Sequence, residues 1–257
     1  MEMATAKATN RSLARGLDML ELLGKSPRGL ALHEITRALA LPKSSASNLV
    51  HTLLDKRFAH YDADTQLYSL SLRAFEVGAA ALAGVDIESV LRAHMREIAD
   101  ECDETVHCGV PDGTDVVYVD KIESTRSIRM ASRIGARMPL YCTAMGRAIL
   151  ACLPNARVAE LLAHQRFEPL TPHTISSPQA LLRELDAVRA RGYAGEREET
   201  NESVCCVGVA LRGREGTARY AISISAPTFR AGDSEMSDYA RLLLRAQGKM
   251  ERYLRAL

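Results

Sequence analysis

The sequence has no apolar run long enough to cross a bilayer, and no two of its cysteines have Cys-x-x-Cys spacing. The longest apolar stretch, residues 77–85 (VGAAALAGV), is short and rich in alanine and glycine, whereas a membrane-spanning helix needs about 20 residues. Residues 1–12 (MEMATAKATNRS) lack the hydrophobic segment of a secretion signal. We therefore expect a cytoplasmic protein with no membrane partner, in which residues 1–11 are disordered.

The six cysteines are expected to be buried thiols, because a reducing compartment disfavours disulfides. They are Cys102, Cys108, Cys142, Cys152, Cys205 and Cys206. His107 lies near the first two in sequence, but a metal site needs three or four converging ligands. We predict no metal and no cofactor.

Length and charge favour a small module that binds nucleic acid, followed by a larger domain of about 170 residues. The 257 residues are 47% hydrophobic, which is enough for a substantial core. Residues 1–60 contain nine lysines and arginines against five acids, whereas the remainder contains 24 against 27. A modest positive bias at one end is typical of a protein that contacts phosphates there.

Residues 31–56 predict two helices joined by a tight turn. Apolar residues near a helical period precede Pro42, and a proline disfavours helix at the residue before it. The second helix, residues 43–56, has one apolar side, formed by Ala46, Leu49, Val50, Leu53 and Leu54. Its other side is polar, with Lys43, Ser44, Ser45, Ser47, Asn48, His51 and Thr52.

A hairpin is expected after these helices. Residues 58–61 and 67–70 are short β runs, and the Asp-Ala-Asp-Thr sequence between them favours a turn. Together these elements predict a winged helix-turn-helix whose second helix presents small hydroxyl and amide groups to DNA. The alternative is a small domain of another kind whose polar helix face is simply solvated.

The rest of the chain predicts an α+β fold with a mostly antiparallel sheet. Strands are expected at residues 105–110, 115–122, 128–133, 205–211 and 219–225. Helices are expected at residues 12–23 (capped by Ser12), 73–83, 87–102, 143–152, 156–163, 178–191 and 234–256. This gives a DNA-binding domain over residues 12–72, a linker helix within 73–85 and a second domain over 86–257.

Two segments of the second domain suggest a ligand site. A Gly/Pro loop leads into a helix at Thr143, and free N–H groups at a helix start favour an anion. Strand alternation puts Ser223 and Ser225 on one face, where two hydroxyls suit the two oxygens of a carboxylate. From the residues alone, a solvent-exposed face is the favoured explanation of the two serines.

Several motifs closely resemble the IclR family of bacterial transcriptional regulators. They are SLARGLDMLELL, LPKSSASNLVHTLL, GARMPLYCTAMGRAILA, RGYAGEREE followed by CC, and AISISAP. The resemblance implies a winged helix-turn-helix joined by a helix to a GAF-like effector domain, in homodimers or homotetramers that bind double-stranded operator DNA and a small carboxylate. Residues 120–151 are most similar to the KdgR-like regulators of sugar-acid catabolism, with regulators of aromatic-acid degradation as the alternative.

The resemblance also implies positions for the effector pocket. They are Ala144, Gly146, Glu196, Cys206, Ser223 and Ser225, and a bidentate contact from Arg129 or Arg133 is a further possibility. This chain departs from the family pattern with Glu196 instead of aspartate, Asn48 instead of arginine, Ser203 instead of glycine and an additional Cys205.

The expected DNA reader is the helix at residues 43–56, inserted in the major groove. Base contacts are predicted for Ser44, Ser45, Asn48 and His51, and phosphate contacts for Ser12, Arg15, Lys43 and Thr52. The competing class is an enzyme with Cys206 as nucleophile and His107 or His164 as base. No Cys-His signature of a hydrolase is present, so a non-enzymatic regulator is predicted.

Overall fold

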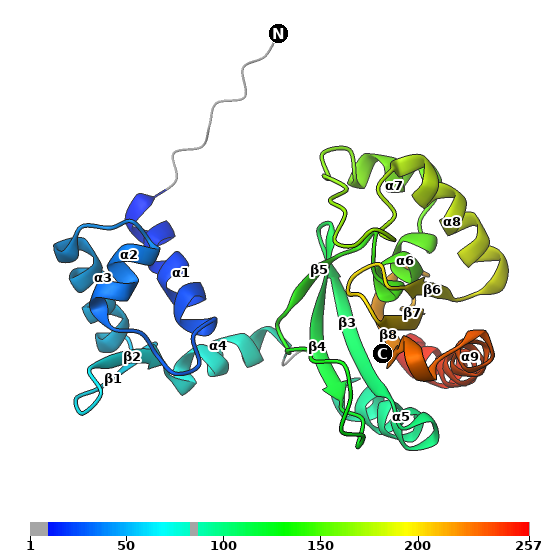
Figure 1. Cartoon of the computed structure of the whole chain (residues 1–257), viewed down its shortest axis with the longest axis horizontal. Helices are drawn as coiled ribbons and strands as arrows, with labels where there is room; N and C mark the ends of the chain where they lie inside the picture. The colour runs from blue at the N-terminus through cyan, green and yellow to red at the C-terminus, as the bar shows by residue number, and fades with distance from the viewer. Residues whose placement is uncertain (1–9, 83–86, 257) are drawn as a thin grey trace, which may run out of the picture. The chain divides into compact units, whose positions relative to one another are not determined.

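The computed structural model describes residues 10–82 and 87–256, and the chain divides into two compact units, residues 1–85 and 86–257. The predicted disordered N-terminus and the end of the predicted linker helix fall largely outside the described residues. The first unit contains α1 (Arg11–Gly24), α2 (Leu32–Ala38), α3 (Lys43–Asp55), β1 (Ala59–Asp62), β2 (Leu67–Leu70) and α4 (Leu72–Leu82) (Figure 1). None of the described helices is long and apolar enough to cross a membrane.

The first unit is a winged helix-turn-helix, as expected. Its core is formed by α1, α2 and α3, and the buried side chains of α3 are Ala46, Val50 and Leu53. The wing is the antiparallel β1–β2 hairpin, and Asp62 Oδ1 stabilises its turn by accepting from the N–H groups of Asp64 (2.9 Å) and Thr65 (3.3 Å). A single bridge from Leu30 to Tyr68 ties the segment before α2 to the wing.

The prediction that Ser12 caps the first helix is wrong. The helix begins one residue earlier, and the Asn10 side chain accepts from the N–H groups of Ser12 and Leu13, both at 3.1 Å. Asn10 has an extended backbone (φ −66°, ψ 103°), the conformation that lets an asparagine side chain reach the free N–H groups of the first turn.

The second unit is built on a six-stranded antiparallel sheet in the order β5-β4-β3-β8-β7-β6 (Figure 1). Its strands are β3 (Thr105–Asp112), β4 (Asp115–Ile122), β5 (Arg137–Pro139), β6 (Ala194–Arg197), β7 (Val204–Arg212) and β8 (Ala218–Pro227). One face packs against α5 (Ile87–Cys102) and α9 (Asp233–Ala256). The other face lies under α6 (Ala144–Ala151), with α7 (Asn155–Leu161) and α8 (Pro178–Arg191) beyond it.

The strand predicted at residues 128–133 is also wrong. That segment is irregular, and side chains rather than a strand bind two of its carbonyls: Arg230 donates to Ile128 O (2.8 Å) and Lys121 Nζ to Ser132 O (2.7 Å). The strand that pairs with β4 lies later, at β5. Sequence patterns missed both β5 and β6, because each has at most four residues and includes proline or glycine.

Small residues on the α6 face of the sheet set the position of that helix. Ala194, Gly208, Ala210 and Ala221 lie where α6 crosses, so the helix backbone approaches the strands closely. A Cβ atom on Gly208 would lie 2.8 Å from the carbonyl carbon of Ala144 and 2.9 Å from Met145 N. The N-terminus of α6 therefore rests directly on the middle of β7.

Candidate functional site

The polar side of α3 is the candidate DNA-contacting surface of the first unit. Lys43, Ser44, Asn48, His51 and Thr52 are exposed, whereas Ser45 is half-buried. Ser12 and Arg15 are exposed on α1. Thr52 Oγ1 donates to Asn48 O (2.8 Å) and His51 Nδ1 contacts Ser47 O (2.7 Å), so two of these side chains are held against the helix. Their contacts with DNA remain predictions.

In the second unit, polar side chains cross the α6 face of the sheet in a continuous row. Glu196, Cys206 and Ser225 are direct cross-strand neighbours, and Ser225 is paired in turn with Thr105. His107 is the partner of Ser223 in the adjoining row. We call Glu196, Cys206, Ser223, Ser225 and His107 the polar row; each is at most 8% exposed. The serine face is therefore buried, which removes the solvent-exposed alternative.

Hydrogen bonds connect the polar row to the segment between β4 and β5. Cys206 Sγ donates to Ser225 Oγ (3.2 Å), and Ser225 Oγ lies 3.3 Å from His107 Nδ1. His107 Nε2 is 2.8 Å from Ser132 Oγ. Burial lowers the pKa of His107 to about 4, so its imidazole is neutral at physiological pH. A neutral imidazole with one N–H and one lone pair can both donate and accept.

The N-terminus of α6 lies next to this row, because Gly208, on which it rests, is the next residue after Cys206 on the same face of β7. Thr143 caps the helix, and its Oγ1 accepts from the Gly146 N–H at 3.0 Å. The Gly146 N–H is thus already used. Any anion at this helix start would meet the preceding N–H groups and the positive end of the helix dipole.

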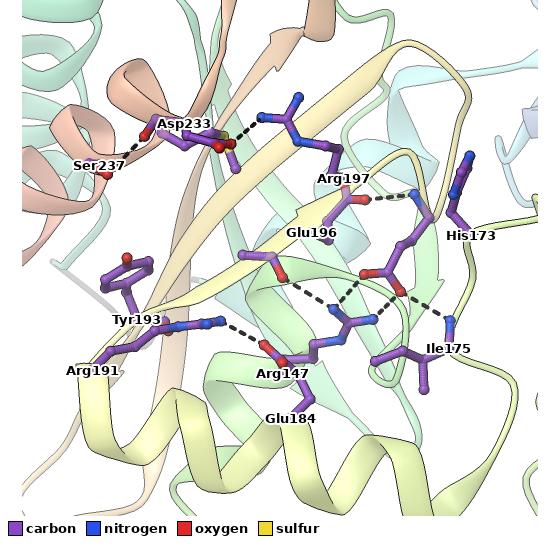
Figure 2. A pocket seen from close by; sticks show the side chains of 13 residues that line it. Arg147, His173, Ile175, Glu184, Arg191, Tyr193, Glu196, Arg197, Asp233 and Ser237 are labelled. Carbon is purple, nitrogen blue, oxygen red and sulfur yellow. Dashed lines mark hydrogen bonds and ion pairs between the residues drawn. The ribbon is translucent and has the colours of Figure 1, made fainter.

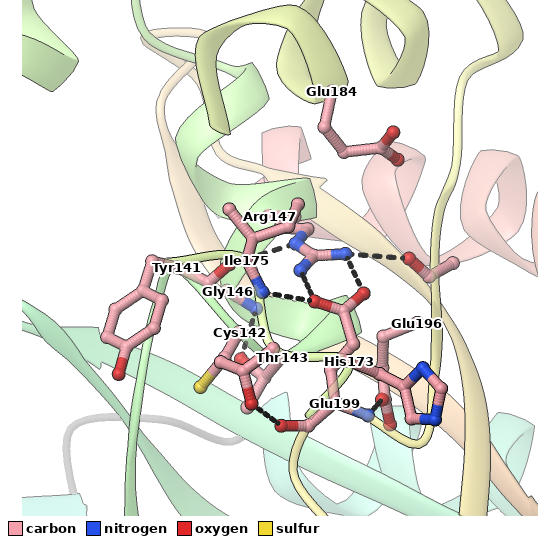
Figure 3. Close-up of polar contacts among 12 residues, drawn as sticks. Tyr141, Cys142, Thr143, Gly146, Arg147, His173, Ile175, Glu184, Glu196 and Glu199 are labelled. Carbon is pink, nitrogen blue, oxygen red and sulfur yellow. Dashed lines mark hydrogen bonds and ion pairs between the residues drawn. The ribbon is translucent and has the colours of Figure 1, made fainter. Parts of the chain in front are cut away.

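Arg147 organises the polar contacts beside the row, as Figure 3 shows. Its side chain is 1% exposed and forms a two-pronged ion pair with Glu199. It also donates to Tyr141 O (2.9 Å) and Gly195 O (3.1 Å). Glu199 in turn accepts from Ile175 N–H (3.0 Å), and its own N–H donates to Glu196 Oε2 (3.0 Å). One buried cation therefore joins α6, β6 and the loop before α8.

Glu196, Arg147 and Glu199 also line an open cavity of about 530 Å³ beside β6 (Figure 2). Other charged groups that line it are also paired: Arg191 with Glu184 on the same helix (2.6 Å) and Arg197 with Asp233 (3.4 Å). Glu196 is therefore the member of the polar row that also lines this cavity.

The structure brings most of the predicted pocket residues together but not the predicted arginines. Glu196, Cys206, Ser223 and Ser225 share one face, and Ala144 and Gly146 belong to the helix above it. Arg129 lies in the irregular 128–133 segment, is exposed and pairs with Glu123 Oε2 at 3.3 Å. Arg133 is also exposed.

Sequence reasoning did not place Ser132 or Arg147 in the site, and it named His107 only as a base in the competing enzyme hypothesis. Strand parity offered a signal for His107, but only once its pairing with Ser223 was known. Ser203, the departure from a usual glycine, has φ +62° in the turn before β7, a conformation in which glycine is unstrained.

The metal and enzyme alternatives have little support in the geometry. No three potential ligands converge among the described residues, and His107 and Cys108 are consecutive strand residues that point to opposite faces. Burial raises the pKa of the Cys206 thiol well above its usual range, whereas a nucleophilic cysteine needs a lowered one. His164 is exposed, after α7.

Known proteins share both units. Residues 12–63 match the IclR helix-turn-helix domain, and residues 79–252 match the family described as bacterial transcriptional regulator IclR C-terminal. The regulator KdgR of Escherichia coli K12 is 34% identical over 93% of this chain and 90% of its own length. The regulator XynR of the same organism is 30% identical over 95% and 97%.

A solved structure gives the same picture. The crystal structure of Thermotoga maritima IclR superposes with a TM-score of 0.80 at 31% identity, over 95% of this chain and 98% of that one. These relatives are transcriptional regulators, not enzymes. With a DNA-binding unit and an effector-type unit that both match, the chain belongs to the IclR family of DNA-binding transcriptional regulators.

Proposed function

We propose that this regulator binds operator DNA through α3 and that a small carboxylate bound against the polar row changes its DNA affinity. The polar row is the observation that supports effector binding by the second unit. A core face with hydroxyl, thiol, imidazole and carboxyl groups is costly to bury unless those groups have partners. Cys206, Ser225 and His107 have partners within the chain, whereas Glu196 Oε1 has none among the described residues, and a small polar ligand would supply one.

The proposed binding of operator DNA is supported by α3 and the residues around it. The helix has 13 residues and is therefore about 20 Å long, a length that fits the major groove. Ser44, Ser45, Asn48 and His51 are placed for base edges, and Lys43 and Thr52 for phosphates. Ser12 and Arg15 on α1 are further phosphate contacts.

Substitutions on α3 separate base contacts from phosphate contacts. Asn48→Ala should weaken operator binding by about 5–150-fold and leave non-specific DNA binding nearly unchanged, because a good base contact contributes about 1–3 kcal/mol. Lys43→Ala should weaken binding to all sequences and reduce the slope of log affinity against log salt by about 0.9. Mobility shifts with the upstream region of the protein's own operon, at several salt concentrations, measure both effects.

The matched control removes the same charge from the second unit, with Lys249→Ala on the exposed surface of α9. It should bind as the unaltered protein does. If Asn48→Ala and Lys43→Ala also bind with unaltered affinity and salt dependence, α3 is not the recognition helix.

Homodimers are expected because two recognition helices can then contact two half-sites of a near-palindromic operator. Large apolar side chains on the first unit support self-association: Leu13 and Leu17 on α1 are 63% and 51% exposed, and Leu72 and Phe75 on α4 are 79% and 72% exposed. The spacings of three and four residues put each pair on one side of its helix.

The proposed effector class is a small carboxylate, with a sugar acid favoured by the resemblance of residues 120–151 to sugar-acid regulators. Ser223 and Ser225 offer hydroxyl donors, and His107 offers a ring nitrogen. Because the whole row is buried, ligand access requires a covering segment to move. Ser132 Oγ contacts His107 Nε2, so the 123–136 segment covers that end of the row and is our candidate for the segment that moves. The protein then has two conformations, before and after this movement. The ligand alters DNA affinity because it binds one of these conformations more tightly than the other.

Removing both serine hydroxyls tests the effector half. The Ser223→Ala/Ser225→Ala variant should lose most of the thermal stabilisation that the unaltered protein gains from an acid it binds, which is about 2.7 kcal/mol at a hundredfold excess over Kd. The probes are D-gluconate, pyruvate and 4-hydroxybenzoate. Operator affinity without added acid should be unchanged.

Ser234→Ala, at an exposed position at the start of α9, is the matched control and should keep the response. An unchanged dose response in the double variant would refute the role of the polar row. If the protein binds its operator but none of the acids stabilises it, the second unit does not have the proposed effector function.

A further inference from the structure

Glu196 has a buried oxygen with no partner. The side chain is 3% exposed, and its Oε2 accepts from the Glu199 N–H at 3.0 Å. Oε1 is fully buried and has no hydrogen-bond partner among the described residues. The Cys206 thiol lies within reach of the Glu196 carboxyl and lowers its pKa, but it has a single proton, and that proton is directed to Ser225 Oγ at 3.2 Å. An unsatisfied carboxyl oxygen inside a protein is costly, and the arrangement points to a hydrogen-bonding group that the described residues do not supply.

Two nearby charges act on Glu196 in opposite directions: Glu199 disfavours its ionised form and Arg147 favours it. The nearest cation, Arg147, has both terminal nitrogens engaged by Glu199. The titratable groups around Glu196 on this side of the sheet are Cys206 on β7, Cys142 and Arg147 at α6, Glu199 in the following turn, Tyr118 on β4 and His173 in the loop before α8. His107 on β3 shares this face further along, whereas Cys205 packs on the opposite face. Burial raises the pKa of Glu196 to about 7.

The cations at the other end of the row are paired as well. Lys121, the strand partner of His107, binds Glu123 Oε1 at 2.7 Å and the Ser132 carbonyl. Arg129 binds the second oxygen of Glu123. A carboxylate that reaches the polar row would therefore meet neutral hydrogen-bond donors and the Glu196 carboxyl, and no free cation among the described residues.

We propose that the effector carboxylate binds by sharing a proton with Glu196, so that the protein takes up about one proton from solvent for each effector bound. This inference rests on the proposed effector function of the polar row. The proton comes from bulk water or buffer and attaches to Glu196 Oε1, which then donates to an oxygen of the effector carboxylate. No other bond forms or breaks, and the pair has a single negative charge.

The physical reason is that two carboxylates in contact inside a protein cannot both stay ionised, because their repulsion is poorly screened there. With one proton between them they form a charge-assisted hydrogen bond, which is stronger than a neutral one. The opposite arrangement, in which ionised Glu196 accepts from an effector hydroxyl, satisfies Oε1 without a proton. The two arrangements differ in how affinity depends on pH.

The experiment counts protons by titration calorimetry of the full chain, in buffers of different ionisation enthalpy, with D-gluconate and pyruvate as probes. At about pH 8, where ligand-free Glu196 is mostly ionised, uptake should approach one proton, and at about pH 6 it should fall towards zero. Affinity should fall by about tenfold for each pH unit above the Glu196 pKa. His107 stays neutral over this whole range and adds no proton.

Glu196→Gln should bind the probe with no proton uptake and with an affinity that does not vary with pH. Glu202→Gln, an exposed change in the same turn, is the control and should keep the uptake. Infrared difference spectra should gain a protonated-carboxyl C=O band on binding at about pH 8, and Glu196→Gln should lose that band.

Binding without proton uptake, or uptake that persists in Glu196→Gln, would overturn the shared proton but leave the effector site intact. Binding that survives unchanged in Ser223→Ala/Ser225→Ala, or no binding of either acid, would overturn the proposed site and the shared proton with it.

Discussion

Replacing Arg147 with alanine should lower the free energy of unfolding by about 3–5 kcal/mol, the usual cost of leaving a buried charge without its partner. The guanidinium is 1% exposed and binds Glu199, Tyr141 O and Gly195 O, so alanine would leave one carboxylate and two carbonyls without their donor. Urea denaturation of the full chain, followed by circular dichroism, measures the loss.

Two further variants distinguish a buried ion pair from a general effect of removing an arginine. Arg157→Ala breaks a pair with Glu160 whose side chains are 62% and 68% exposed, and it should leave stability almost unchanged. The Arg147→Met/Glu199→Leu double variant replaces the pair with apolar groups and should recover much of the loss. Equal, small effects of Arg147→Ala and Arg157→Ala would contradict the role given to Arg147.

Gly146→Ala should also destabilise the chain, by about 1–3 kcal/mol, although alanine is the better helix former. A Cβ atom there would overlap the Cα and carbonyl oxygen of Leu140 and would lie 2.6 Å from Thr143 Oγ1, which caps the same helix. Because the obstacles are mostly backbone, they cannot move aside cheaply. Thermal and urea unfolding measure the change.

Gly248→Ala is the matched control for this substitution. It lies on the exposed side of α9, and a Cβ atom there would have nothing within 4 Å. Helix propensity alone predicts a gain of about 1 kcal/mol at both positions, so opposite signs at Gly146 and Gly248 are the expected result. A gain at both would mean that α6 is not packed against the Leu140 backbone as described.

Much of this fold could be predicted from the sequence, because periodic apolar residues and turn residues indicate local structure. The apolar side of α3, the wing turn at Asp62 and the cap of α8 at Ser177 all depend on residues close in sequence. The irregular 128–133 segment could not be predicted in this way. Its carbonyls are bound by Lys121 and Arg230, and Arg230 is about a hundred residues away in sequence.

The candidate site was predictable only in part, for the same reason. Alternation puts Ser223 and Ser225 on a common face, but which face is buried depends on where α6 packs. His107 joins them through the register of β3 against β8. Arg147 is an ordinary helical cation in the sequence, and its contacts with Glu199 and Gly195 appear only when α6, β6 and the following turn come together.

The position of β6 at one edge of the six-stranded sheet has a consequence for solubility. An edge strand offers backbone groups that can pair with a strand from another molecule, and such pairing starts aggregation. Here β6 has only four residues, the Arg147 side chain binds the Gly195 carbonyl, and Arg197 reaches the carbonyl of Ala231 near α9. Of these two contacts, the one from Arg147 occupies a backbone carbonyl of the edge strand itself, so a chain that lacks Arg147 would be more prone to join its sheet to those of other copies.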